Sequence, residues 1–352
     1  MRTAIQADHA RYAKQVNPMK PFNAEVAERA IVRARELEAA HGRRHLLRAT
    51  RGVILAAGGF TYDLELLNRH LPIYGRNVAA LIRMGSIGSV GSGIRLGESA
   101  GGTAAYMDSL YSARILSPPK TLLNGILVNQ RGDRFVNEEI YAGYLGRSIG
   151  RQTGGLAWLI VDRSSYWKAI RECFTAGWTS FRWFTLPTLM NTLLGRTKRA
   201  RTLERLAAKC GISRNGLLSA IKNYNEAIET SAPDPMGKKT RKAIARGAFY
   251  AIDMSIGGKC GFTMIITLGG LRVSEETGNV IRSDGSVIQG LYAAGRTAAG
   301  LCAIGYFSGM SLSDGVFSGR RAGAHAAQCH PESTRIHSQA DVAQSDLLRS
   351  FT

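Results

Sequence analysis

The chain has 352 residues, 45% of them hydrophobic, and a formal net charge of +20 with a pI near 10.2. Its length predicts about two domains, and its apolar fraction is typical of a globular protein with a buried core. The basic charge would suit nucleic acid. However, the sequence has no zinc-finger spacing and no interleaving of aromatic and basic residues, so we expect no specific nucleic-acid binding. Loose attraction to an anionic membrane surface fits the charge better.

Cysteine and histidine usage narrows the chemistry. The five cysteines lie far apart, without the spacing of a metal site or a disulfide framework, which predicts a cytoplasmic protein. The first 20 residues lack the apolar segment of a secretory signal, and no stretch of about 18 apolar residues predicts a membrane span. Residues 71–324 contain no histidine. We therefore expect no metal site, and catalysis there by tyrosine, arginine, lysine or carboxylates.

In chain order, the first strong patterns are a helix and a strand. Residues 23–41 are rich in Ala, Glu and Arg, which predicts a helix. Residues 51–60 form a short apolar run ending in Gly58 and Gly59, which predicts a buried strand followed by a glycine turn. Residues 88–101 predict a glycine-rich turn that leads into a helix. Its free N–H groups would suit a phosphate or an oxygen-rich cofactor edge, although a plain structural turn explains the glycines equally well.

The middle of the sequence predicts a separate, mixed α/β unit over residues 109–264. Residues 157–162 are typical of a strand. Residues 163–196 are aromatic and irregular, and their rings would pack in the core of this unit or line a pocket. The apolar spacing over residues 202–224 is helical, with a break at Gly211.

The last third returns to short strands and glycines. Residues 267–273 lead to a hairpin-like stretch at 277–280, and residues 290–295 predict a buried strand with a glycine exit. A helix is expected from Met310 to about residue 327, followed by a polar tail over 331–352.

Four motifs in this order resemble one family of flavoproteins, which includes fumarate reductases, flavocytochromes c and 3-ketosteroid dehydrogenases. They are residues 53–60, residues 125–129 with 134–138, residues 267–270, and residues 290–295 with 311–314. The resemblance implies FAD as the cofactor. It also implies an α/β fold, in which an incomplete Rossmann-type FAD-binding domain of the glutathione-reductase kind carries an inserted α+β substrate cap. The expected divisions are FAD-binding residues 1–108 and 265–330, the cap at 109–264, and the tail at 331–352.

Departures from the family pattern favour one branch of it. Fumarate reductases carry a histidine pair where this chain has Ile265 and Ile266, and their substrate-binding arginine lies in a loop that here reads Gly305-Tyr306-Phe307-Ser308-Gly309. A carboxylate substrate would lose these cationic partners. A tyrosine in this loop is similar to ketosteroid dehydrogenases, whose loop tyrosine polarises a ketone. The resemblance therefore implies a lipophilic ketone, such as a 3-oxosteroid, as substrate.

The resemblance also suggests catalytic roles. Tyr306 and the backbone N–H groups near Gly309 would stabilise the oxygen of a developing enolate, while the flavin takes a hydride at N5. Tyr141 would transfer the α-proton, with its neighbour Tyr144 as the alternative. Ser308 would position the ketone or relay the proton. A structural alternative for Tyr306 is that its ring merely packs on the flavin.

The expected FAD-binding residues lie on both sides of the cap. They are Ala57, Gly58, Gly59, Gly91, Gly93, Gly295, Arg296, Ser311 and Leu312. Arg296 stands where many relatives place a glutamate that binds the ribityl chain. The competing functions are a fumarate or enoate reductase and a non-catalytic remnant, and no nicotinamide or haem-attachment motif identifies the electron acceptor.

One part of a dinucleotide-binding fold is not found in the sequence. Such a fold begins with a strand, a G-x-G-x-x-G turn and an acidic residue about 20 positions later, yet residues 1–50 contain no glycine before Gly42. A truncated product, a split enzyme with a second polypeptide, and a degenerate protein that no longer binds flavin would each explain this. We favour truncation, because the predicted N-terminal helix continues into family-like sequence without a linker.

Overall fold

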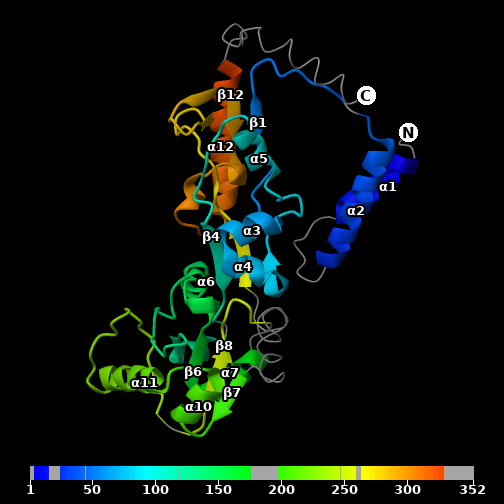
Figure 1. Cartoon of the computed structure of the whole chain (residues 1–352). Helices are drawn as coiled ribbons and strands as arrows, with labels where there is room; N and C mark the ends of the chain where they lie inside the picture. Colours follow the sequence, from blue (N-terminus) through cyan, green and yellow to red (C-terminus); the bar gives the residue numbers. More distant parts are fainter. Residues whose placement is uncertain are drawn as a thin grey trace.

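Two bodies lie end to end along the long axis of the molecule (Figure 1). A computed structural model describes residues 4–15, 24–43, 45–117, 119–175, 197–245, 247–258 and 263–328. The upper body contains the segments before and after the predicted cap together with the strands at the two ends of that cap, and the lower body contains the rest of the cap. The predicted α/β class is confirmed. The aromatic residues 178–184 and the predicted tail lie outside the described residues.

The upper body is built on three small sheets. The first has the order β1-β12-β11, with β1 parallel and β11 antiparallel to β12. The second pairs β3 with β10, and the third has the order β2-β9-β4. The strands are β1 (Val53–Leu55), β2 (Leu81–Arg83), β3 (Ala104–Ala105), β4 (Leu110–Arg114), β9 (Thr263–Thr267), β10 (Gly270–Leu271), β11 (Asn279–Ile281) and β12 (Val287–Ala293).

Short helices accompany these sheets, and the long C-terminal helix α12 packs along β12. The helices of this part are α3 (Leu64–His70), α4 (Pro72–Arg76), α5 (Ser92–Ser99) and α12 (Met310–Gln328), with the short 3₁₀ helices η1 (Val78–Ala80), η5 (Gly295–Thr297) and η6 (Leu301–Ala303). The sequence predicted α12 correctly. Asp314, Ser318 and Ala322 form its buried face, because their spacing of four residues places them on one side of the helix.

The strand predicted within residues 51–60 is present as β1, but the prediction that it is buried was wrong. β1 has three residues, and Val53 and Ile54 are 47% and 39% exposed. The reason is that β12 flanks β1 on one side while, among the described strands, none pairs with its other edge. The outer face of α12 is also apolar and open, since Leu312, Val316 and Phe317 are exposed.

The two bodies are joined through β4 and β9, which pair antiparallel over five residues each. β4 and β9 lie at the two ends of the predicted cap, so the chain enters and leaves the cap through two paired strands. Helix α6 (Ala142–Gly150) packs against β4 at this junction. The proposed boundaries at residues 109 and 264 fall at these two strands and stay a prediction.

The lower body is one antiparallel sheet between two groups of helices. Its order is β5 (Ile126–Val128), β6 (Trp158–Asp162), β8 (Phe249–Asp253), β7 (Thr197–Ala200). Side chains alternate across the sheet, so that Leu127 and Leu159 join the main core while Ile126 and Ile160 join a second core. The accompanying helices are α7 (Arg163–Thr175), α10 (Leu203–Cys210) and α11 (Arg214–Glu229), with η2 (Lys120–Asn124) and η3 (Thr153–Gly155).

The helices of the cap agree with the sequence in one place and differ in another. The predicted break is confirmed, because Gly211 ends α10 with a φ of 65°. The expectation of irregular structure from residue 163 was wrong, since α7 begins there. Asp162 Oδ1 accepts the backbone N–H of Ser165 at 2.7 Å, a capping bond that lets the helix start directly after β6.

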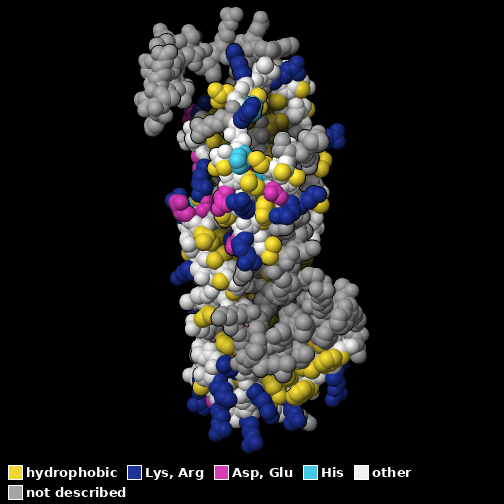
Figure 2. Space-filling view, turned by 90° about the vertical axis from the view of Figure 1, so that its right-hand side faces the viewer, with side chains coloured by type: hydrophobic (Ala, Val, Ile, Leu, Met, Phe, Trp, Pro, Cys, Tyr) yellow, Lys and Arg dark blue, Asp and Glu magenta, His cyan; other side chains and the backbone are white. Residues whose placement is uncertain are grey.

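The N-terminal helices stand beside the upper body. Helix α2 (Ala24–His41) confirms the helix predicted at residues 23–41, and helix α1 (Ala4–Gln15) packs on it. Glu28 of α2 forms an ion pair of 2.9 Å with Arg83. Over the described ranges, the helices are too short or too polar to cross a membrane. Figure 2 shows lysine and arginine side chains over the described upper part of one face, and a group of them at the lower end, where β7 and α10 lie.

Candidate active site

A cluster of glycines follows β1 and begins α5. Gly91 adopts a φ of 71° at the start of α5, and Gly58 a φ of 85° after β1. A Cβ at Gly59 would lie 2.6 Å from Thr267 Oγ1, and a Cβ at Gly93 would lie 2.8 Å from Thr297 Cγ2. Close packing inside the fold therefore explains Gly59 and Gly93 by itself, and their cofactor role stays a prediction.

Arg296 lies against this glycine cluster, with its guanidinium buried in the protein. Nη2 donates to Ser89 Oγ at 3.2 Å, and a Cβ at Gly85 would come within 2.8 Å of the same nitrogen. Nη1 is buried without a hydrogen-bond partner, and within the described ranges no carboxylate pairs with this cation. Burial lowers the pKa of Arg296, which shows the cost of holding the charge there.

An unsatisfied buried donor beside glycines without side chains suits a ligand rich in oxygen atoms. FAD is such a ligand, so the residues present fit it. We expect Arg296, with the backbone around Gly58 and Gly295, to bind it. The Ser311 hydroxyl bonds the Tyr306 hydroxyl at 3.1 Å and Leu312 is 77% exposed, and the cofactor role of these two residues stays a prediction.

Three tyrosines from different segments meet near the junction of the two bodies. Tyr306, in the loop before α12, is 8% exposed. Its ring centroid lies 4.7 Å from that of Tyr111, on β4. Tyr141, which directly precedes α6, has its hydroxyl 3.2 Å from the Tyr111 hydroxyl. Tyr111 thus contacts both tyrosines that the sequence singled out.

The loop of residues 305–309 contacts Tyr141 directly. The backbone N–H of Ser308 donates to the Tyr141 hydroxyl oxygen at 2.8 Å, and the Phe307 ring lies 5.4 Å from the Tyr141 ring. Gly309 has a φ of 94°, and a Cβ there would meet no atom within 4 Å. This backbone is open toward a ligand, which keeps a donor role for Gly309 compatible with the geometry.

Tyr144, the alternative for proton transfer, lies one helical turn from Tyr141. Its ring centroid is 6.2 Å from that of Tyr141, and it lines a small cleft together with Tyr111, Arg147 and Tyr306. In contrast to Tyr141, no described residue forms a hydrogen bond with its hydroxyl. The geometry therefore supports Tyr141 over Tyr144.

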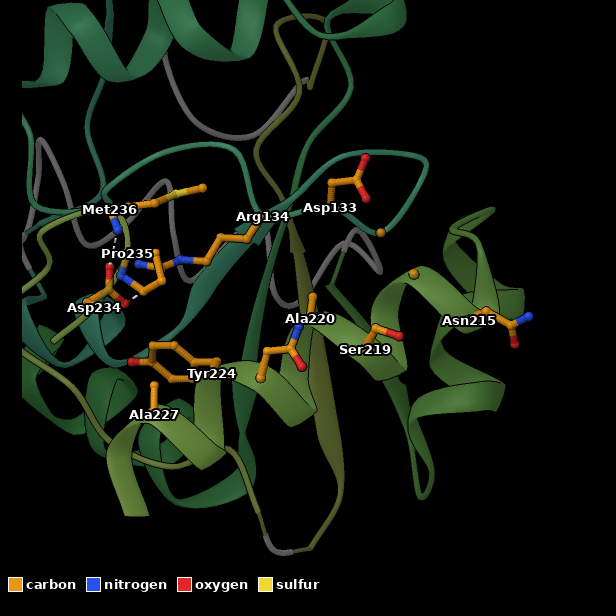
Figure 3. Close-up of a pocket in the computed structure, with 13 residues that line it drawn as sticks. Asp133, Arg134, Asn215, Ser219, Ala220, Tyr224, Ala227, Asp234, Pro235 and Met236 are labelled. Carbon is orange, nitrogen blue, oxygen red and sulfur yellow. Dashed lines mark hydrogen bonds and ion pairs between the residues drawn. The ribbon is translucent and has the colours of Figure 1, made fainter. Parts of the chain in front are cut away.

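A larger cavity of about 510 Å³ lies in the cap, between α11 and the turn at residues 132–134 (Figure 3). None of the expected cofactor or catalytic residues lines it. Its wall contains part of a buried charge network, in which Glu138 pairs with Arg134 at 2.8 Å and with Lys238 at 3.1 Å, and Arg134 also binds Asp234. We assign this network to cap stability, because its two cations and two carboxylates satisfy one another.

The sequence analysis missed Tyr111. In β4 this residue lies opposite Ile266 of β9, directly before the motif at residues 267–270. The two strands are separated by the whole cap in the sequence, so only their pairing shows that Tyr111 belongs to the site. The one available signal in the sequence was that Tyr111 is an aromatic residue close to the predicted start of the cap at residue 109.

Comparisons with known proteins identify the family of this chain. Residues 22–312 match the sequence profile of the family described as FAD binding domain. The 3-oxo-5-alpha-steroid 4-dehydrogenase of Comamonas testosteroni is 34% identical over 213 residues, which are 60% of this chain and 40% of that protein. A fumarate reductase (cytochrome) of Shewanella frigidimarina is 28% identical over 286 residues, 78% of this chain and 45% of that protein.

A solved structure is also similar. It is 3-ketosteroid-delta4-(5alpha)-dehydrogenase from Rhodococcus jostii RHA1 in complex with 4-androstene-3,17-dione, with 34% identity and a TM-score of 0.63 over 82% of this chain and 55% of that one. The chain thus spans about half the length of these relatives. The resemblance and the FAD cofactor expected from the sequence are confirmed at the level of the family. The chain belongs to the FAD-binding domain family, together with relatives named as steroid dehydrogenases and fumarate reductases.

Proposed function

We propose that this chain acts as an FAD-dependent oxidoreductase on the carbon–carbon bond next to the ketone of a 3-oxosteroid. The observation that carries the proposal is the meeting of Tyr141 from the cap with the 305–309 loop, through the Ser308 N–H bond of 2.8 Å. This contact joins a proton-transfer group to the loop that holds the expected ketone-binding donor. The names of the steroid-dehydrogenase relatives support the same substrate class.

Each of these residues has its own role in the proposed reaction. Tyr306 donates its hydroxyl to the ketone oxygen, and one such donor contributes about 3 kcal/mol to stabilising a developing enolate. Tyr141 accepts the proton from the neighbouring carbon. Bound FAD supplies a hydride acceptor at N5. Ser308, whose side chain is exposed, connects Tyr141 with the solvent.

The apolar surroundings favour a lipophilic ketone over a dicarboxylate. Ile265 and Ile266 are buried in β9, where a dicarboxylate enzyme of this family would have histidines, and Tyr306 packs with Ile266, Leu268 and Cys302. Exposed Leu301, Ile304 and Phe307 border the same loop. Such side chains give apolar contact area to a steroid and no charge to a carboxylate.

Flavin reduction tests the proposal. The chain, saturated with FAD under anaerobic conditions, is mixed with a saturated 3-oxosteroid, and flavin absorbance is followed. We expect bleaching with the steroid and none with succinate. Absence of bleaching with 3-oxosteroids, combined with fumarate-dependent oxidation of the reduced flavin, would support the reductase alternative. Failure to bind FAD at all would support a non-catalytic remnant.

A further inference from the structure

We infer that Tyr111 is a positioning residue that donates a hydrogen bond to Tyr141 and thereby prepares it to accept the substrate proton. The inference rests on the proposed function, because it concerns the same proton-transfer step. It adds a third phenol from β4, outside the motifs that identified the family.

The hydrogen bonds around the Tyr141 oxygen give the direction of the effect. The Ser308 N–H can only donate, so at 2.8 Å it uses one acceptor position of that oxygen. The Tyr111 hydroxyl stands 3.2 Å away and can donate to a second position. Two donors on one phenol oxygen stabilise negative charge there, so Tyr141 is prepared to act as a base.

Tyr111 is suited to the donor role because it keeps its own proton. Burial is the main cause that raises its pKa, and the neighbouring Tyr141 and Tyr306 raise it further. Tyr111 therefore keeps its proton at neutral pH and has it available for donation to Tyr141.

Packing holds the Tyr111 ring in this place. β4 pairs with β9, and the ring lies between Tyr306 on one side and α6 on the other. A Cβ at Gly143 would overlap Cε2 of Tyr111, so the ring approaches α6 where the helix has no side chain. Substitution of Gly143 by Ala would displace the Tyr111 ring, and to a smaller extent the Tyr141 ring whose Cε1 lies 3.1 Å from that Cβ, while both hydroxyls are kept.

Other titratable groups face the same oxygen from the elements packed around it. Tyr144 and Arg147 come from α6, Tyr306 from the loop before α12, and Arg296 interacts electrostatically with Tyr306. Neither Tyr306 nor Tyr144 forms a hydrogen bond with the Tyr141 hydroxyl within the described residues. A change in the pH dependence after removal of the Tyr111 hydroxyl is therefore attributable to that hydroxyl.

The step itself is a balanced proton transfer. The phenolate of Tyr141 takes the α-proton of the ketone and becomes the neutral phenol, and the electron pair of the C–H bond moves into the enolate, while the Tyr111 hydroxyl stays hydrogen-bonded to the Tyr141 oxygen. No oxidant takes part, so the step can be measured with the hydride acceptor blocked. In heavy water it appears as exchange of the α-hydrogen for deuterium.

The experiment follows this exchange in a saturated 3-oxosteroid by NMR, with the chain saturated with FAD that is kept reduced. The variants are Tyr111→Phe, Gly143→Ala, Tyr141→Phe and, as the control, Tyr74→Phe. Tyr74 is another buried phenol. Its hydroxyl donates to the backbone oxygen of Gly146 at 3.4 Å and not to Tyr141. We expect Tyr111→Phe to exchange about tenfold to a hundredfold more slowly at neutral pH, the loss typical of a bond to a charged group.

The pH profile separates positioning from structure. Without the Tyr111 donor, Tyr111→Phe should reach its half-maximal exchange rate at a higher pH than the unchanged chain, and Gly143→Ala should shift in the same direction. A rate lowered equally at every pH would show a structural role and overturn the inference, as would a rate and profile like those of Tyr74→Phe. Exchange by Tyr141→Phe at the full rate, or no exchange by the unchanged chain, would contradict the proposed function itself.

Discussion

The backbone N–H of Ser308 donates a hydrogen bond of 2.8 Å to the hydroxyl of Tyr141, across a sequence separation of 167 residues. This bond connects the cap with the loop before α12. It makes the proposed proton-transfer group and the proposed ketone-binding loop interdependent, which leads to the first prediction.

Tyr141→Phe should reduce steroid-dependent flavin reduction by about 10²- to 10⁴-fold, the range of a positioned acid or base. FAD affinity should stay the same, because no described contact joins the Tyr141 phenol to Gly58, Gly59 or Gly93. Stopped-flow absorbance and flavin fluorescence measure the two quantities. If Tyr144→Phe shows this loss while Tyr141→Phe retains activity, the proton-transfer role belongs to Tyr144.

Tyr306→Phe should lower the same rate by about a hundredfold or more, because the enolate oxygen loses a donor. Ser311→Ala is the informative companion, since it removes the partner of the Tyr306 hydroxyl but leaves the donor in place. We expect Ser311→Ala to lose much less activity. Equal losses in the two variants would show that the bond between them matters more than the donor.

Arg296→Met should have opposite effects on the two forms of the protein. Without FAD, it removes a buried donor that has no partner, so the free energy of unfolding should rise by about 1 kcal/mol. FAD binding should weaken by about tenfold or more. Calorimetry and fluorescence titration measure these effects, and Arg296→Lys should retain part of the affinity. Unchanged affinity in Arg296→Met would remove this residue from the cofactor site.

Glu138→Gln should destabilise the cap by about 3–5 kcal/mol, because it leaves the buried cations of Arg134 and Lys238 with one carboxylate fewer. The control is Asp133→Asn, which breaks the exposed pair with Arg131 and should cost less than about 1 kcal/mol. Urea unfolding compares the two. A small effect of Glu138→Gln would mean that water reaches the network.

Asp234 gives a pH dependence of stability. Burial favours its neutral form, but hydrogen bonds from Arg134 and from the backbone N–H groups of Met236 and Lys238 outweigh burial and lower its pKa below the usual 3.8. Its stabilising contribution is therefore complete above about pH 4 and is lost as the pH falls through the lowered value. The stability difference between the unchanged chain and Asp234→Asn should shrink in acid. A difference independent of pH would contradict this.

Local sequence patterns predicted the helices and helix ends that depend on composition, glycine positions or apolar spacing within the segment itself. The helix α2, the break at Gly211 and the start of α12 follow from composition, a glycine and apolar spacing. The start of α7 was missed because its signal is the single cap from Asp162, in a segment dominated by aromatic residues. The exposure of β1 was missed because an apolar run does not show whether a neighbouring strand covers it.

The candidate site was only partly predictable, for a physical reason. Tyr141 and Tyr306 stand in motifs that a sequence displays. Tyr111 joins them only because β4 pairs with β9, which follows the cap in the sequence. The register of such a non-local strand pair cannot be predicted from the sequence of either strand alone. Arg296 was visible in the sequence, but its unsatisfied nitrogen depends on which side chains surround it.

Among the strands that the structure describes, only β12 pairs with β1, and the edge this leaves open has a consequence for the behaviour of the chain in solution. An unpaired strand edge with exposed apolar side chains can pair with a strand of another molecule. The apolar outer face of α12 enlarges the exposed apolar surface. We expect the purified chain to self-associate as its concentration rises, and a charge introduced as Ile54→Lys should suppress this association. Light scattering at several concentrations measures it, so handling at low concentration is a requirement that the fold itself imposes on every experiment above.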